Sequence, residues 1–150
     1  MQDLLIYAGG AIQHFINEEK FYKATQWREN LLILLKESEI DRNITIYDPT
    51  SYFKERKRYS PETIIDVNTY YLTRADILVV NTFQLLNSPG TIREITYFYD
   101  NKKPRIGFND HVKSQKEMDI YNGYTYTKML TDNFNSLDEV IKYIKVCFYV

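Results

Sequence analysis

Cysteine and histidine are scarce in this sequence of 150 residues, which has one cysteine, Cys147, and two histidines. A lone cysteine excludes an intramolecular disulfide, and three such residues cannot supply a zinc site of four Cys and His ligands. No apolar run reaches the roughly 18 residues that cross a bilayer. The start at residues 1–6 lacks the basic region of a signal peptide and favours a first strand. We therefore expect a cytoplasmic protein without a membrane partner.

A charge excess of one sign is also absent. Nineteen basic and twenty acidic residues give a net charge of −1, so there is no general attraction to nucleic acid or to anionic lipid. The basic run at 54–58 is predicted to be a solvated loop. A chain of this length buries roughly 68–70% of its unfolded surface, and no linker or repeat divides it. We therefore expect one domain over residues 1–150.

Strand-like and helix-like segments alternate along the chain. Short apolar or β-branched runs predict strands, and apolar residues at three- and four-residue steps predict helices. The expected strands cover 4–8, 44–47, 75–81, 103–108 and 124–130, and the expected helices cover 17–37, 61–74, 88–100 and 136–147. The polar stretch 109–122 is left unassigned. This alternation favours an α/β fold: a doubly wound, flavodoxin-like open parallel sheet of about five strands, with helices on both faces.

The ligand crevice of such a sheet lies beyond the carboxyl ends of its strands. This rule gathers residues 7–10, Asp48 and residues 81–94 along one edge. Glu94 would lie in the first two turns of a helix that begins near Ser88, where backbone amides favour an ionised carboxylate. Such a group can attack an anomeric carbon, although a surface glutamate at a helix start is the plainer interpretation.

Several neighbouring residues have both a functional and a plain interpretation. The hydroxyl of Tyr7 could orient Glu94, or the residue could be one of many core and rim tyrosines. Gly90 would admit a substrate close to the backbone. Gly9 and Gly10 lack the G-x-G-x-x-G spacing of a dinucleotide site. The two histidines, His14 and His111, are read as surface or loop residues, and Trp27 is read as core.

Five blocks then occur in one order along the chain. They are Ile6-Tyr7-Ala8-Gly9-Gly10-Ala11-Ile12, Trp27-Arg28, Asp48-Pro49, Arg74-Ala75-Asp76-Ile77-Leu78-Val79-Val80-Asn81, and Pro89-Gly90-Thr91-Ile92-Arg93-Glu94. This succession resembles the nucleoside 2-deoxyribosyltransferase family, including its 2′-deoxynucleoside 5′-phosphate N-hydrolase relatives. The likeness covers roughly residues 4–108, with a family-like final helix after Ser136.

The resemblance implies a role for each matching residue. Glu94 matches the glutamate that attacks the anomeric carbon and holds a covalent deoxyribosyl intermediate, and Tyr7 matches the tyrosine that hydrogen-bonds it. Ser88 stands where transferases often carry an aspartate for the sugar 5′-hydroxyl, whereas the hydrolases tend to place serine there, near a 5′-phosphate. Asn68 stands where the family usually has an aspartate that protonates or binds the base. An amide cannot donate a proton as a carboxylic acid does.

Asp66 could take the place of that acid if the helix register differs, and Asn68 and Ser88 could be plain helix polarity and capping. Gly9, Gly90 and Thr91 complete the expected substrate contacts. The resemblance also implies a homo-oligomer whose neighbouring chains complete each site, with Asn133 as the residue a neighbour would lend.

The sequence thus predicts a nucleoside 2-deoxyribosyltransferase that exchanges bases through Glu94 and needs no metal or organic cofactor. Its small-molecule partners would be a deoxynucleoside or deoxynucleotide and a free nucleobase. One alternative is a 2′-deoxynucleoside 5′-phosphate N-hydrolase. Another is a nucleotide-binding module without catalysis, which the departures at Asn68 and Ser88 suggest.

Overall fold

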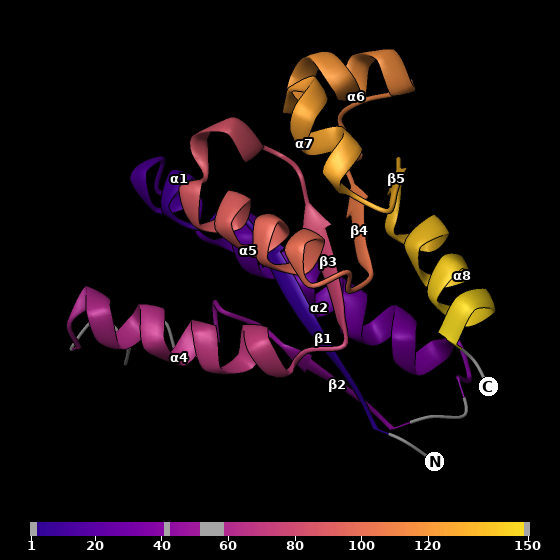
Figure 1. Cartoon of the computed structure of the whole chain (residues 1–150), viewed down its shortest axis with the longest axis horizontal. Coiled ribbons are helices and arrows are strands. Elements are labelled where there is room, and N and C mark those ends of the chain that lie inside the picture. Colours follow the sequence, from indigo (N-terminus) through magenta and orange to yellow (C-terminus); the bar gives the residue numbers. More distant parts are fainter. Residues whose placement is uncertain (1–2, 41–42, 52–58, 149–150) are drawn as a thin grey trace.

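The computed structural model describes residues 3–40, 43–51 and 59–148. Its five strands form one parallel sheet in the order β2-β1-β3-β4-β5 (Figure 1). The strands are β1 (Leu4–Gly10), β2 (Ile44–Tyr47), β3 (Ile77–Asn81), β4 (Arg105–Phe108) and β5 (Asp132–Phe134). Four consecutive apolar residues of β3 are buried, and this strand is central, as its unbroken apolar run predicts.

Helices cover both faces of this sheet. They are α1 (Gln13–Asn17), α2 (Tyr22–Glu37), α4 (Pro61–Arg74), α5 (Pro89–Asp100), α6 (Gln115–Asn122), α7 (Tyr124–Met129) and α8 (Leu137–Phe148). A short 3₁₀ turn, Leu85–Asn87, precedes α5. In the described part of the chain, none of these helices has the length and apolarity that a membrane span requires. The arrangement is the expected open, doubly wound, flavodoxin-like α/β fold.

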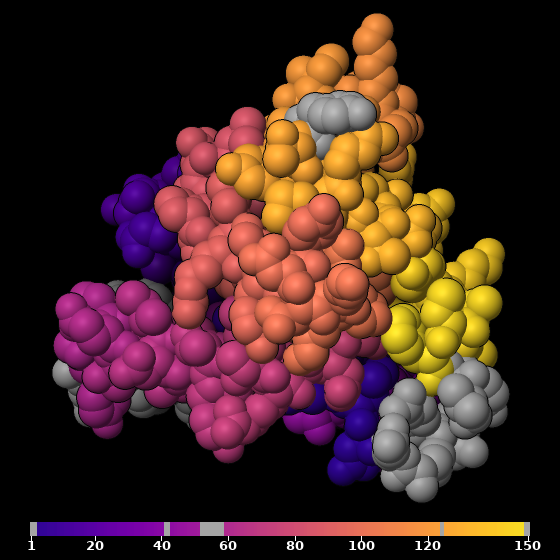
Figure 2. Space-filling view, viewed as in Figure 1, coloured from indigo at the N-terminus to yellow at the C-terminus, as the bar shows by residue number. Residues whose placement is uncertain are grey.

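Two apolar cores lie on opposite faces of the sheet. The first joins α2 and α8 to the strands through side chains such as Trp27, Leu31 and Ile144. The second joins α4 and α5 to the other face through Leu72, Ile95 and others. Figure 2 shows the outer surface of this second layer, with α4 and α5 side by side and α7 beyond them.

Two expectations about local structure are wrong. Residues 124–130 do not form a strand: they contain α7, and the fifth strand is Asp132–Phe134. The alternating Tyr and Thr residues favour a strand, but strand preference depends on tertiary context. Here Thr127 packs on α6, where its hydroxyl donates to the carbonyl of Met118 at 3.5 Å.

The helix expected over 17–37 is broken into α1 and α2. Glu19 lies between them with a φ of 56°, a left-handed conformation that ends α1. The unassigned stretch 109–122 contains α6. The basic run at 54–58 lies outside the described residues.

Candidate functional site

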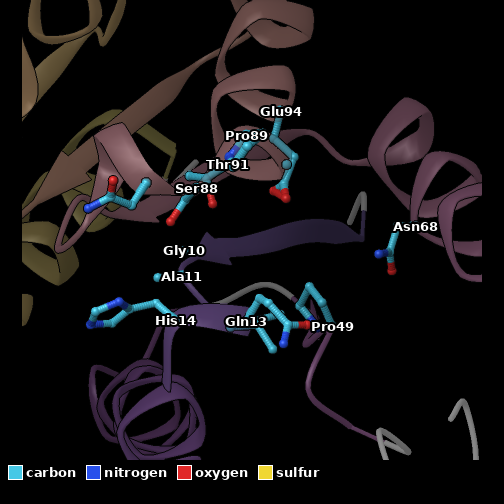
Figure 3. A pocket seen from close by; sticks show the side chains of 13 residues that line it. Gly10, Ala11, Gln13, His14, Pro49, Asn68, Ser88, Pro89, Thr91 and Glu94 are labelled. Atoms are coloured by element: carbon cyan, nitrogen blue, oxygen red, sulfur yellow. The ribbon is translucent and has the colours of Figure 1, made fainter. Parts of the chain in front are cut away.

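A cavity of about 220 Å³ opens at the carboxyl edge of the sheet, beside the end of β1 (Figure 3). It lies at the switch point between β1 and β3, because the helices that follow these strands cover opposite faces. Its walls come from the segment after β1, from Pro49 after β2, from α4 and from the start of α5. The lining residues are Gly10, Ala11, Ile12, Gln13, His14, Pro49, Asn68, Asn87, Ser88, Pro89, Gly90, Thr91 and Glu94.

Glu94 extends from the second turn of α5 into this cavity (Figure 3). The residue as a whole is half-buried, but its Oε2 atom is closed to solvent and has no hydrogen-bond partner within the described residues. Burial raises the pKa of this carboxyl from 4.5 to about 8, while the positive charges of Arg28 and Arg93 act in the opposite direction. The carboxyl is therefore mostly neutral at pH 7, and its pKa lies about one unit above that pH.

Gly9 provides the space for the Glu94 carboxyl. A Cβ atom at Gly9 would lie 2.9 Å from Glu94 Oε2 and 3.2 Å from Leu78 Cδ1. Both contacts are too short for an unstrained methyl group. Gly9 thus contributes to the site by bringing the backbone of β1 directly against the carboxyl.

Tyr7 lies on β1 two residues before Gly9, and its side chain is buried. Burial and then the charge of Glu94 raise the pKa of its phenol well above the ordinary value, so the phenol is neutral. Its ring packs at a tilt on Tyr47, with 5.1 Å between centroids. The structure brings Tyr7 and Glu94 within electrostatic range, but it forms no hydrogen bond between them in the described residues.

Asn68 lines the cavity from α4. The hydroxyl of Tyr47 donates a hydrogen bond of 2.6 Å to Asn68 Oδ1, which fixes the orientation of the amide. Asp66, the alternative candidate, is exposed and lines a separate depression with Tyr70 and Tyr71. The helix register therefore brings the amide into the site and keeps the acid out of it.

Ser88, Gly90 and Thr91 form the rim of the cavity at the start of α5. Ser88 occupies the N-cap position of α5, but its hydroxyl donates to the carbonyl of Gln84 at 2.8 Å and makes no capping hydrogen bond to the helix. A Cβ at Gly90 would meet no atom within 4 Å, so this position faces open space. Thr91 is buried.

Asn133 lies apart from these residues, on the edge strand β5. Its Nδ2 donates to the carbonyl of Thr127 at 3.1 Å. Its Oδ1 is buried and lies 2.8 Å from the position a Cβ would take at Gly107. Within its own chain Asn133 therefore packs between β4 and α7 and does not reach the cavity.

Arg28 is the main residue of the site whose role is not predicted from the sequence. Its side chain is fully buried beneath the end of β1, where Nε donates to the carbonyl of Ala8 at 3.0 Å and Nη2 to that of Gly10 at 3.3 Å. Nη1 donates to the carbonyl of Ala24. The Nε atom also lies 3.6 Å from Asp48 Oδ1. Burial lowers the pKa of the guanidinium to about 10, which leaves it charged at neutral pH.

The sequence did carry a signal for Arg28. The buried positions of α2 are Ala24, Trp27, Arg28, Leu31 and Leu35, so the arginine interrupts an apolar stripe. A charge at such a position is expected to be paired and hydrogen-bonded. His14 gives no comparable signal, yet it lines the cavity with its side chain 22% exposed, and Nε2 lies 3.3 Å from Glu18 Oε1.

Comparisons with known proteins identify the fold alone. No family model matches this chain, and no curated protein matches it. Among solved structures, a conserved protein from Enterococcus faecalis V583 is similar with a TM-score of 0.64, at 14% sequence identity, over 97% of this chain and 99% of that one. This chain therefore shares its fold with that protein over nearly its whole length.

Proposed function

We propose that this protein cleaves the N-glycosidic bond of a 2′-deoxynucleoside and transfers the sugar to another nucleobase through a covalent deoxyribosyl-Glu94 intermediate. The observation that carries the proposal is the Glu94 carboxyl: it borders a cavity at the switch point of the sheet, and one of its oxygens has no hydrogen-bond partner in the described residues. Leaving a buried polar atom unpaired is costly, and such groups gather at functional sites.

The first step needs Glu94 in its ionised form. A carboxylate oxygen bonds to C1′ of the sugar as the bond from C1′ to the base nitrogen breaks, and that electron pair leaves with the base. The transition state carries positive charge on the sugar ring. A carboxylate that is poorly solvated in the free protein stabilises that charge strongly, because little water must be displaced.

The second step reverses the first with a different base. A ring nitrogen of the incoming base attacks C1′, the ester bond to Glu94 breaks, and the carboxylate is regenerated. The incoming base loses one proton and the departed base gains one, so the exchange is balanced. Two inversions at C1′ restore the original configuration.

The remaining lining residues suit a sugar and a base. The amide of Asn68, held by Tyr47, can hydrogen-bond a base edge. The open space at Gly90 and the first turn of α5 allow a sugar to approach the backbone. Arg28 holds the backbone on both sides of Gly9 and so maintains the surface against which Glu94 rests.

Ser88, at the rim of the cavity, favours one alternative function, that of a 2′-deoxynucleoside 5′-phosphate N-hydrolase. Ser88 lines the cavity there and carries no negative charge to repel a phosphate. In that reaction water, instead of a second base, attacks the glycosyl-Glu94 ester. A third candidate, binding without turnover, follows from the missing acid at Asn68.

Product analysis distinguishes these candidates. The protein is incubated with deoxyinosine or thymidine plus adenine, and with the corresponding 5′-phosphates, and the products are separated by chromatography. New deoxyadenosine supports transfer, free deoxyribose or its phosphate supports hydrolysis, and saturable binding without product supports the third candidate. Glu94→Gln should abolish turnover, whereas the matched change Glu29→Gln, at an exposed position of α2, should not.

The same proposal includes a cytoplasmic location and a homo-oligomer. Of the residues in α4 only Leu72 is buried, while Ile65 and Tyr70 are each 52% exposed, so this helix offers apolar surface to a second copy. Light scattering on the purified protein tests the point. A strictly monomeric mass at working concentration would contradict it.

A further inference from the structure

A second cavity, of about 330 Å³, lies at the same edge of the sheet but on its other face. Its walls are Phe15 of α1, one face of α2, the ends of β3 and β4 with the segments that follow them, and the start of α8. It shares no lining residue with the cavity that contains Glu94. The proposed reaction therefore leaves this cavity unused.

Aromatic side chains form much of its lining. Phe15 and Phe83 are stacked with 5.5 Å between centroids and 5° between planes. Trp27 meets the edge of Phe108 at 5.3 Å, and the His111 ring tilts over Phe83 at 4.7 Å. These rings come from four separate parts of the chain and make flat apolar walls of the kind that stack on a planar ring.

Polar groups at the same cavity add hydrogen-bonding capacity. Gln26 and Asn30 lie four residues apart on one face of α2 and present amides beside Trp27. Trp27 is only 7% exposed, and its indole N–H donates to no acceptor within the described part of the chain. The indole nitrogen itself is not closed to solvent, so this donor is available to a ligand. Lys23 and Asp110 line the cavity with opposite charges, which favours a neutral ligand.

We propose that this second cavity binds a neutral, planar heteroaromatic ring with hydrogen-bond acceptors on its edge, a ligand of the size and chemistry of a free purine base. The ring stacks in the aromatic lining, accepts from the Trp27 indole, and pairs with the amides of α2. The proposal does not depend on Glu94 or on the reaction assigned to it.

The two cavities come close together where Gly10 packs against Trp27. Gly10 lines the first cavity, and a Cβ at Gly10 would lie 3.2 Å from the Trp27 ring, which lines the second. Arg28 stacks on that ring at 4.5 Å and also donates to the Gly10 carbonyl. A ligand on either side therefore contacts residues that are packed against the other site.

Trp27 is the single tryptophan of the chain, so its fluorescence reports on this cavity directly. Adenine is titrated into the protein with excitation at a wavelength that selects tryptophan over tyrosine. We expect a saturable change in emission. Asn30→Phe, which fills the cavity from an exposed position of α2, should weaken binding at least tenfold. Glu29→Phe adds the same ring on the same helix outside the cavity and should leave binding unchanged.

One further variant separates the two cavities. Gly90→Phe adds a ring to the first cavity, where no atom lies near the new Cβ, and it should leave the adenine response intact. The absence of a saturable response in the unmodified protein would overturn the proposal. A response lost in Gly90→Phe but kept in Asn30→Phe would also overturn it, because adenine would then occupy only the first cavity. An equal response to cyclohexanol, a saturated ring of similar size, would refute the assigned ligand class.

Discussion

Replacing Glu94 by glutamine should stabilise the folded protein, and the gain should grow with pH. In the unfolded chain the carboxyl ionises near pH 4.5, whereas in the folded protein burial raises its pKa to about 8. Folding therefore favours the protonated form. The stability that this provides is fully present below pH 4.5 and is lost as the pH rises toward 8. Glutamine does not ionise, so the Glu94→Gln variant does not lose this contribution to stability as the pH rises.

The size of the gain follows from the two pKa values. Without solvent screening, the difference corresponds to about 3 kcal/mol at pH 7 and to less than about 1 kcal/mol at pH 5. Glu94 borders a cavity that admits water, which screens part of this cost. We therefore expect Glu94→Gln to raise the free energy of unfolding by about 1–2 kcal/mol at pH 7, and by somewhat more at pH 8.5.

The assay is urea unfolding of both proteins at pH 5, 7 and 8.5, followed by circular dichroism. Only the difference between the two proteins is used, so that other titrating groups cancel. A difference that stays constant across these three pH values would refute the claim that burial sets the charge of Glu94. A variant that is less stable than the unmodified protein at pH 8.5 would refute the same claim.

Three further predictions concern the same site. Gly9→Ala should lower turnover at least tenfold, because its methyl group displaces the Glu94 carboxyl, and should cost only about 1 kcal/mol of stability, because the groups it meets are the movable ends of side chains; unchanged kinetics would count against this packing. Arg28→Met should cost about 3–5 kcal/mol in urea unfolding because Asp48 loses its positive partner and two carbonyls of β1 lose their donor, against less than about 1 kcal/mol for the exposed Arg74→Met. The value of kcat/KM should rise with pH and level off above about pH 8, since the proposed attack by Glu94 needs the anion; a flat profile from pH 6 to 9 would contradict that role.

Much of the fold could be predicted because its strongest signals are local. The apolar run of β3 needs no tertiary information to be read as a buried central strand, and Ser60-Pro61 predicts the start of α4. The carboxyl ends of parallel strands lie along one edge of the sheet, where ligands bind. This rule predicts from the sequence alone that Glu94 lies beside the end of β1. The strand predicted over residues 124–130 was wrong because their strand preference is weaker than the packing of α7 on α6.

The parts that could not be predicted depend on contacts between distant residues. The charge state of Glu94 is set by its burial against Gly9 and by the position of Arg28. Both residues are distant from Glu94 in the sequence, so the sequence does not reveal these contacts. The second cavity likewise needs Phe15, Trp27, Phe83 and Phe108 to meet, although each is an ordinary core residue when read alone. The sequence could predict the edge of the sheet at which the cavities open, but not the number of separate cavities along it.

The buried guanidinium of Arg28 also bears on how this edge of the sheet moves. It bonds to two carbonyls of β1 and one of α2, so hydrating it would require the helix to separate from the strand. Amide hydrogen exchange at the end of β1 should therefore proceed only through global unfolding. The backbone at Gly10, between the two cavities, should therefore stay in place when a ligand binds on either side.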